Sequence, residues 1–430
     1  MLGGLMPNRF LVCCVILICF GFGFYKMPEH RIPEAFQAHT AIAAGAKEPL
    51  FQSRFASSAQ HIQTHASSLI ELKDGRIRAF WFAGSKEGAK DVEIRSAVFE
   101  PASGQWSAEQ TVATREGTQQ SLLRYVSKLG NPVVGRAADG ALWMYYVTVS
   151  VGGWAGSSIT AMTSTDDGAT WSPARRLITS PFLNISTLVK GAPFFYADGT
   201  MGLPVYHEFI GKFGELLHLD KAGKILDKQR LTAGGSGALQ PVVLVKDSSD
   251  ALVLMRYSGK DTPHRALSIT TSDAGQHWTS HVKSALPNPD AALSALVLPD
   301  GKILAALNHQ EQGRDELSLA ISADSGNTWK NIYQLEDQRN QTPDEANYLK
   351  VAEALAKSTD AKAASAPAEY VESAKRQKCL DHGCSFEFSY PYLIQAQSGD
   401  IHLVYTWNRS FIKHVRFNQA WLDQQLKEAK

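Results

Sequence analysis

The sequence predicts an all-β fold: a six-bladed β-propeller of four-stranded antiparallel blades, preceded by a hydrophobic N-terminal anchor helix. Two observations predict the propeller. One is a turn motif that recurs along the chain, and the other is a series of six small hairpin turns spaced roughly 50 to 65 residues apart, with the fifth interval lengthened by an insert. An apolar run at the N-terminus predicts the helix.

The recurrent turn motif has the pattern Ser/Thr-x-Asp-x-Gly-x-x-Trp. It occupies residues 164–171, 271–278 and 322–329, with a shortened copy at 102–106. In a hairpin turn the Asp accepts backbone N–H groups, the Gly adopts a positive φ and the Trp packs the turn onto the sheet. One copy would predict only a turn, whereas several copies indicate an internal repeat.

Six further turns, each between two apolar strands, mark the start of successive units. They are Asp74-Gly75, Asp139-Gly140, Asp198-Gly199, the stretch 247–250, Asp300-Gly301 and Ser398-Gly399. Six meanders arranged radially form a β-propeller, which leaves few exposed sheet edges. A β-sandwich is the alternative, but it does not predict a six-fold repeat.

An unbroken apolar run extends from Phe10 to Tyr25, between Arg9 and Lys26. As a helix it spans about 24 Å, less than the ~30 Å hydrocarbon core of a bilayer, so it is either a secretory signal or a short signal anchor. We predict an uncleaved anchor, because no small-residue cleavage site directly follows the run. The predicted organisation is an anchor at 1–26, a linker at 27–56 and a propeller at 57–422, with an Ala-, Lys- and Glu-rich helical insert at about 337–378.

Charge and cysteine content narrow the function classes. The 43 basic and 42 acidic residues give no basic stripe of the kind that binds nucleic acid. Cys379 and Cys384 lie five residues apart, as in a local disulfide of an exported protein, whereas a zinc site that also used His382 would lack a fourth ligand. We therefore predict an exported protein, periplasmic or extracellular, that needs no metal or cofactor and contacts a membrane only through its N-terminal segment.

In a propeller blade the first strand begins and the second strand ends at the same face, so residues at these positions gather around one mouth of the axis. The candidates are His65, Asn131, Lys190, Gln240, Asn288 and Tyr390 before first strands, and Glu87, Asp91, Trp154, His207, Glu208, Arg256, Asn308, His309, Asn408 and Arg409 after second strands. A solvated loop explains any one of them, but polar side chains from six blades indicate a binding site. The recurrent Asp turns belong to the other face and are structural.

With these segments the sequence resembles the sialidase (neuraminidase) family, in particular bacterial sialidase-like propellers with Asp-box repeats. Besides the Asp boxes, the resemblance lies in residues 65–69, 81–91, 130–132, 240–241, 389–392 and 405–409, and it covers roughly residues 60–420. It implies a retaining glycosidase with a tyrosine nucleophile, a glutamate that helps to remove the tyrosine proton and an acid/base aspartate on a first-blade loop. It also implies three arginines that hold a substrate carboxylate.

Carried over by position, the resemblance implies that Tyr390 is the nucleophile, Asp91 the acid/base and Arg256 one of the arginines. The chain departs from the family pattern at two places. His65 stands where the family has an Arg-Ile-Pro motif, and Gln240, which cannot act as a base, stands where it has the glutamate. Glu208 is the nearest substitute for that glutamate. Arg409 and Lys190 offer further positive charge, and Asn131, His207, Asn308, His65 and Gln240 complete the predicted substrate-binding set.

Three functions remain open at this stage. The first is a sialidase-like exo-glycosidase that hydrolyses a terminal anionic sugar, sialic acid or similar, from a glycan. The second is a uronate lyase or another glycosidase that uses His65, His207 and Tyr390 on the same scaffold. The third is a propeller that binds a glycan without catalysis.

Overall fold

The computed structural model describes residues 9–25, 33, 35–37, 42–43, 45–58, 63–180, 184–339, 346, 350, 375, 379–380 and 383–429. The chain forms two compact units, Met1–Ile32 and Pro33–Lys430. The first unit contains helix α1 (Arg9–Tyr25). None of the helices in the described part of the chain combines the length and the apolar character needed to cross a bilayer. The anchor function of α1 therefore stays a prediction.

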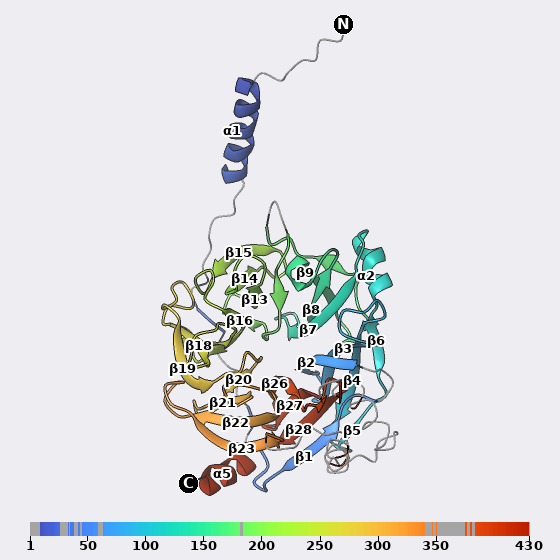
Figure 1. Cartoon of the computed structure of the whole chain (residues 1–430), viewed down its shortest axis with the longest axis vertical. Helices are drawn as coiled ribbons and strands as arrows, with labels where there is room; N and C mark the ends of the chain where they lie inside the picture. The colour runs from blue at the N-terminus through green and yellow to red at the C-terminus, as the bar shows by residue number, and fades with distance from the viewer. Residues whose placement is uncertain are drawn as a thin grey trace. The chain divides into compact units, whose positions relative to one another are not determined.

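Within the second unit, six antiparallel sheets are arranged radially, which confirms the predicted six-bladed propeller (Figure 1). Blade one contains β2 (Gln63–Glu71), β3 (Ile77–Gly84), β4 (Glu93–Glu100), β5 (Gln105–Trp106) and β6 (Gln110–Ala113). Blade two contains β7 (Lys128–Arg136), β8 (Leu142–Val149), β9 (Ser157–Ser164) and β10 (Arg175–Arg176). Blade three contains β11 (Leu188–Val189), β12 (Phe194–Phe195), β13 (Met201–His207), β14 (Phe213–Leu219) and β15 (Ile225–Arg230).

The remaining blades follow the same order. Blade four contains β16 (Ala238–Val245), β17 (Ala251–Tyr257), β18 (Arg265–Thr271) and β19 (Val282–Pro287). Blade five contains β20 (Ser294–Val297), β21 (Ile303–Leu307), β22 (Glu316–Ser322) and β23 (Lys330–Asp337). Blade six contains β26 (Phe388–Gln395), β27 (Ile401–Trp407), β28 (Phe411–Phe417) and β1 (Phe51–Phe55). Helix α2 (Arg115–Leu122) and the short η1 (Trp154–Gly156) connect strands, and α5 (Gln419–Glu428) follows blade six.

The two ends of the propeller are joined in blade six. Strand β1, from the range predicted as a linker, pairs with β28 in antiparallel register, Phe51 opposite Phe417 and Phe55 opposite Lys413. Part of that range thus belongs to the propeller itself. Because β1 precedes blade one and β28 belongs to the last blade, their pairing closes the ring, with β1 as the outermost strand of blade six.

The six predicted hairpin turns and the three Asp-box turns lie on one face, which we call the hairpin face. The opposite face, where first strands begin and second strands end, is the mouth face. Each Asp box is satisfied locally: Asp166 Oδ1 accepts the backbone N–H of Thr170 at 2.9 Å, and the Ser164 hydroxyl accepts that of Gly168 at 2.8 Å. The same bonds recur around Asp273 and Asp324. The boxes are therefore structural units, as their sequence predicts.

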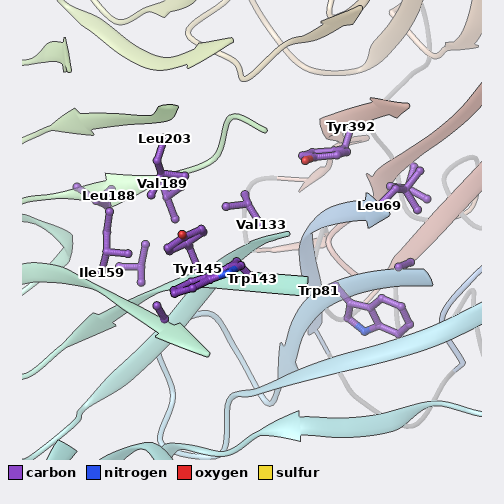
Figure 2. Close-up of a cluster of buried hydrophobic side chains, with 14 of the residues drawn as sticks. Leu69, Trp81, Val133, Trp143, Tyr145, Ile159, Leu188, Val189, Leu203 and Tyr392 are labelled. Atoms are coloured by element: carbon purple, nitrogen blue, oxygen red, sulfur yellow. The ribbon is translucent and has the colours of Figure 1, made fainter. Parts of the chain in front are cut away.

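The core consists of apolar side chains packed between neighbouring blades. Figure 2 shows one cluster, in which Trp81 of blade one, Tyr145 of blade two and Leu203 of blade three are all buried. Tyr392 of blade six belongs to the same cluster, which therefore reaches from the blade interfaces to the wall of the axis. The alternation of inward and outward side chains along each strand supplies these residues.

A short segment before β1 lies against the hairpin face. Phe36 is 1% exposed, and its ring packs on Phe194 and Tyr196 with centroids 5.6 and 5.5 Å away. Its backbone N–H donates to Ser248 O at 2.8 Å, and Ala43 N–H donates to Gln397 O at 3.0 Å. The segment thus contacts the hairpin turns of blades three, four and six.

Two predictions concern the region between blades five and six. Cys379 and Cys384 form the predicted disulfide in the small hairpin of β24 (Cys379–Leu380) and β25 (Gly383–Cys384). The surface helix predicted after Thr342 lies outside the described residues.

Candidate functional site

A β-bulge near the start of the first strand turns one side chain toward the axis in four of the blades. In each bulge two residues of the first strand oppose one residue of the second, and the first of the two has a positive φ. The residues concerned are Ala66, Asn131, Gln240 and Tyr390, with φ between 46° and 54°. Bulges re-aim side chains in this way at active sites. In three of the four bulges the next residue is proline, which lacks the N–H that a regular ladder would need.

The phenol of Tyr390 is linked to three other blades. Its hydroxyl oxygen lies 3.1 Å from Gln240 Nε2, which donates to it. The same amide nitrogen lies 3.5 Å from the hydroxyl of Tyr206, and Asn131 Nδ2 approaches that hydroxyl at 3.5 Å as well. Arg256 Nη1 donates to Gln240 Oε1 at 3.4 Å, which fixes the amide with its nitrogen toward the two phenols. Gln240 therefore joins the predicted Tyr390 and Arg256 directly, and Tyr206 extends this group to the predicted Asn131 of blade two.

His65 and Lys190 complete the wall around Tyr390. The His65 ring lies 4.3 Å from the Tyr390 ring, and its Nδ1 is 2.9 Å from the Thr406 hydroxyl. Burial, reinforced by Arg409, Arg314 and Lys190 and opposed by Glu387, holds the pKa of His65 well below its ordinary value, so the ring is neutral.

Lys190 Nζ donates to the carbonyl of Pro391 at 3.1 Å and lies over the rings of Tyr390 and Tyr392, 5.8 and 5.1 Å from their centroids. Burial lowers the pKa of this lysine to about 7. The side chain of Lys190 therefore changes its protonation state near neutral pH, next to the ring of Tyr390.

Arginines and carboxylates alternate around one side of the site. Arg256 Nε donates to Asp290 Oδ1 at 2.6 Å, and Arg314 Nη2 donates to the backbone carbonyl of Asp290 at 2.6 Å. Arg314 Nη1 lies 3.6 Å from Glu387, whose two oxygens accept from Arg409 Nε at 3.1 and 2.9 Å. The series runs from blade four through blade five to blade six.

Glu87 extends this series into blade one, because its carboxylate accepts from Arg409 Nη1 at 2.6 Å. Burial acts to lower the pKa of Arg409, but Glu387 and Glu87 raise it above its ordinary value. For Arg256 burial acts in the same direction and is outweighed by Tyr390 and Asp290, which raise the pKa. Both guanidinium groups are firmly charged.

Glu208 lies at the end of β13, on the same side as Arg256. Burial raises the pKa of its carboxyl, and Arg256 and Lys212 partly oppose this shift. The charge of Glu208 also acts on Tyr206, whose pKa is raised, first by burial and then by Tyr390 and Glu208. Glu208 is therefore a carboxylate whose charge acts on Tyr206.

Three predicted site residues make their contacts away from Tyr390. Both carboxylate oxygens of Asp91 accept from Ser85, at 2.9 Å from its N–H and 2.8 Å from its hydroxyl, and the side chain is exposed. His207 stacks on Phe213 with centroids 4.6 Å apart. Asn308 is buried and donates to Phe388 O at 2.8 Å, which joins blade five to blade six. None of these contacts reaches Tyr390.

Sequence reasoning missed several residues that the structure places in the site. Tyr206 lies inside a strand, so the rule that selects strand ends overlooks it. Arg314 follows a second strand, and Asp290 and Glu387 precede first strands. The rule that selects strand ends could therefore have found all three. The sequence signal that finds the central residues is the X-Pro pair in the first strand, shared by Asn131, Gln240 and Tyr390.

The arrangement combines a phenol, a neutral imidazole, an amide and several guanidinium groups at the mouth face of the propeller. Such a set suits the binding of a polyhydroxylated ligand that carries a carboxylate, because guanidinium forks match carboxylates and amides match hydroxyls. Among the described residues, no three His, Cys, Asp or Glu side chains form a group that suits a metal ion.

Comparisons with known proteins agree with the architecture. The profile of the family described as "BNR repeat-like domain" matches residues 75–403. Solved structures with the same fold include the Hadza microbial sialidase Hz136, with 15% identity and a TM-score of 0.60 over 84% of this chain and 66% of that protein. A protein of unknown function from Dyadobacter fermentans has 13% identity and a TM-score of 0.60, over 85% of this chain and 98% of its own.

The intramolecular trans-sialidase from Ruminococcus gnavus is a further structural neighbour, with 12% identity and a TM-score of 0.58 over 90% of this chain and 98% of that one. The search of curated proteins finds no match. At these identities the structural likeness establishes the propeller fold, and the chain spans about two thirds of the length of the Hadza microbial sialidase.

Proposed function

The chain belongs to the BNR repeat-like domain family, and we propose that it is a sialidase-like exo-glycosidase that removes a terminal acidic sugar from a glycan. The observation that carries the proposal is the meeting of Tyr390, Gln240 and Arg256 at the mouth face, from blades six and four. Tyr390 offers a nucleophile, and Arg256 offers positive charge for the sugar carboxylate. The sialidase structures among the neighbours support a glycan as the substrate class.

In the proposed reaction the Tyr390 oxygen attacks the anomeric carbon while the glycosidic bond breaks. Asp91, on the exposed first-blade loop, gives a proton to the leaving oxygen, and water then releases the sugar from Tyr390 with Asp91 as the base. A phenol with an ordinary pKa of ~10 must lose its proton to react well. Gln240 donates to the phenol oxygen and cannot take that proton, so we assign this role to Glu208, the carboxylate on the side of Tyr206.

A second candidate function has an observation of its own. A neutral His65 lies against Tyr390, and the neighbouring hydrogen-bond donors are the amides of Gln240 and Asn131. Amide and guanidinium donors can stabilise the negative charge on a uronate carboxylate while a histidine or tyrosine removes the adjacent carbon-bound proton. The C=C bond forms as the glycosidic C–O bond at the next carbon breaks and the leaving oxygen takes up a proton. This set favours a uronate lyase as the alternative.

One assay separates these functions. Purified protein is incubated with a fluorogenic sialoside, a panel of uronic-acid glycosides and uronate oligosaccharides. Release of sialic acid that disappears in Tyr390→Phe supports the exo-glycosidase, and an ultraviolet-absorbing unsaturated uronate supports the lyase. Specific retention of a glycan without turnover contradicts both and leaves a binding propeller.

We also propose that the propeller works outside the cytoplasm, anchored by α1. The disulfide between Cys379 and Cys384 supports export, because disulfides persist in oxidising compartments. Cell fractionation tests this: the full-length protein should be found in the membrane fraction and be open to added protease in cells whose outer layers are permeabilised. Recovery in the cytosol would contradict it.

A further inference from the structure

Three arginines from three successive blades line one side of the site, and each already contacts a carboxylate of the chain itself. Asp290 binds Arg256, Glu387 lies beside Arg314, and Arg409 is contacted by both Glu387 and Glu87. A ligand carboxylate that needs an arginine must therefore compete with an internal one. The ligand that the site selects therefore depends on which internal carboxylate can be displaced from its arginine.

The two carboxylates on Arg409 are held very differently. The Glu387 side chain is 9% exposed, accepts from the Ser389 hydroxyl at 2.9 Å and has its backbone N–H bound to Asn408 Oδ1 at 2.9 Å. The Glu87 side chain is 30% exposed and comes from the loop between β3 and β4, where Ser85, Lys86 and Lys90 are exposed. The backbone N–H of Glu87 is bound as well, to Gln63 Oε1, so the difference lies in the exposure of the two side chains. Displacing Glu387 would bury an unpaired charge, whereas Glu87 can return to water.

The position of Arg409 places this exchange beside the reacting groups. The carbonyl of Arg409 accepts the N–H of Thr64, the residue before His65, and the charge of Arg409 acts on the His65 ring. That ring lies against Tyr390. A carboxylate that replaced Glu87 on Arg409 would therefore belong to a ligand that also reaches His65 and Tyr390.

We propose that Glu87 is an internal stand-in for the ligand carboxylate, paired with Arg409 until the carboxylate of an acidic sugar replaces it. The inference rests on the proposed function for the class of ligand, an acidic sugar, but not on turnover. Glu87 then determines specificity, because a neutral sugar brings nothing to exchange for the ion pair. It also couples binding to the loop that carries Asp91, since that loop loses its contact with blade six when Glu87 leaves.

The test uses Glu87→Gln in the full-length protein, with Asp74→Asn as the matched control. Asp74 forms a carboxylate–arginine pair with Arg76 in a hairpin turn on the other face, with the side chains 51% and 44% exposed. Affinities for N-acetylneuraminic acid and glucuronic acid, and for the methyl ester of each, are measured by calorimetry. We expect Glu87→Gln to bind the acids about fivefold more tightly, the size of effect that a partly exposed ion pair supports, and the esters unchanged.

Limited trypsin digestion gives a second readout, because Lys86 and Lys90 lie on the same loop. Either acid should speed cleavage there in the original protein, and Glu87→Gln should be cleaved faster without ligand, while Asp74→Asn behaves as the original. Weaker acid binding by Glu87→Gln, an equal gain for acid and ester, or no binding of any of them overturns the inference. Absence of sialoside turnover together with the expected changes in affinity overturns only the proposed reaction.

Discussion

The hairpin face and the mouth face are built from the same strands but treat their backbone differently. Five of the six hairpin turns place a glycine at the positive φ that the turn requires, namely Gly75, Gly140, Gly199, Gly301 and Gly399. In the Asp boxes of the same face, the residue before the box glycine also has a positive φ, namely Asp167, Ala274 and Ser325. At the mouth face the residues with positive φ are Ala66, Asn131, Gln240, Asp290, Tyr390, Asn408 and Arg409, and most of them carry polar side chains. Side chains held in that region carry backbone strain, and such strain gathers at functional sites. On the hairpin face these residues lie in repeated turns that maintain the fold, whereas at the mouth face they include Gln240 and Tyr390, to which we assign the proposed chemistry.

Removing one hydroxyl from each face is the strongest test of this division. Tyr390→Phe should lower kcat/KM by about a thousandfold, equivalent to about 4 kcal/mol, because the variant has no nucleophile. Its free energy of unfolding should stay close to that of the original protein. Tyr196→Phe, a tyrosine packed on Phe36 at the hairpin face, should keep full activity. A similar loss in both variants would mean that the faces are not functionally distinct.

The packing of Phe36 tests how much the hairpin face contributes to the stability of the fold. Phe36→Ala removes a ring that is 1% exposed between Phe194 and Tyr196, so the free energy of unfolding should fall by about 3 to 5 kcal/mol. Chemical denaturation measures the loss, and kcat should not change while the protein is folded. Phe209→Ala, at a side chain 55% exposed, is the control and should change stability by less than about 0.5 kcal/mol.

Lys190 tests how far a buried charge at the mouth face lowers the free energy of unfolding. Burial lowers the pKa of its folded form to about 7, whereas the unfolded chain keeps an ordinary value of ~10.4. Between these values the unfolded chain binds more protons, so stability should rise with pH from about 7 to about 10. Below pH 7 both forms are charged and the penalty is complete.

Lys190→Met should therefore stabilise the protein at pH 7 by about 2 to 3 kcal/mol, after the lost bond to the Pro391 carbonyl, and should flatten the pH dependence. Denaturation at several pH values measures both effects. Lys413→Met is the counterpart, because that buried lysine is paired with Glu336 at 2.6 Å and its loss should destabilise. A loss of stability in Lys190→Met would show that its charge is compensated by groups around the site.

The fold could be predicted from local signals in the sequence, whereas the candidate site could be predicted only in part. Hairpin turns and Asp boxes are made by residues adjacent in the chain, so their pattern predicts six blades without knowledge of distant contacts. The mouth residues Tyr390, Gln240 and Arg256 follow from strand order alone. The pairing of Arg409 with Glu87 joins residues 322 positions apart through the reach of two long side chains, and no spacing rule encodes it. Phe36 stands alone in a stretch without periodicity, and only its packing on Phe194 and Tyr196 shows that it belongs to the core.

The smallest expected effect bears on the strain at the mouth face itself. Ala66 has a φ of 53° and is 1% exposed, so glycine at this position would relieve the backbone while losing one buried methyl group. The relief of about 1 to 2 kcal/mol offsets the loss of about 0.8 kcal/mol for the methyl group and the added entropy of the unfolded chain. Ala66→Gly should therefore change the free energy of unfolding by less than about 0.5 kcal/mol.

The control is Ala97→Gly, at an equally buried position in the regular strand β4. This position has no strain to relieve, so the free energy of unfolding should fall by about 1 to 2 kcal/mol. Equal losses in the two variants, measured by denaturation under the same conditions, would mean that the bulge at Ala66 stores no strain, and the contrast between the faces would then rest on the side chains alone.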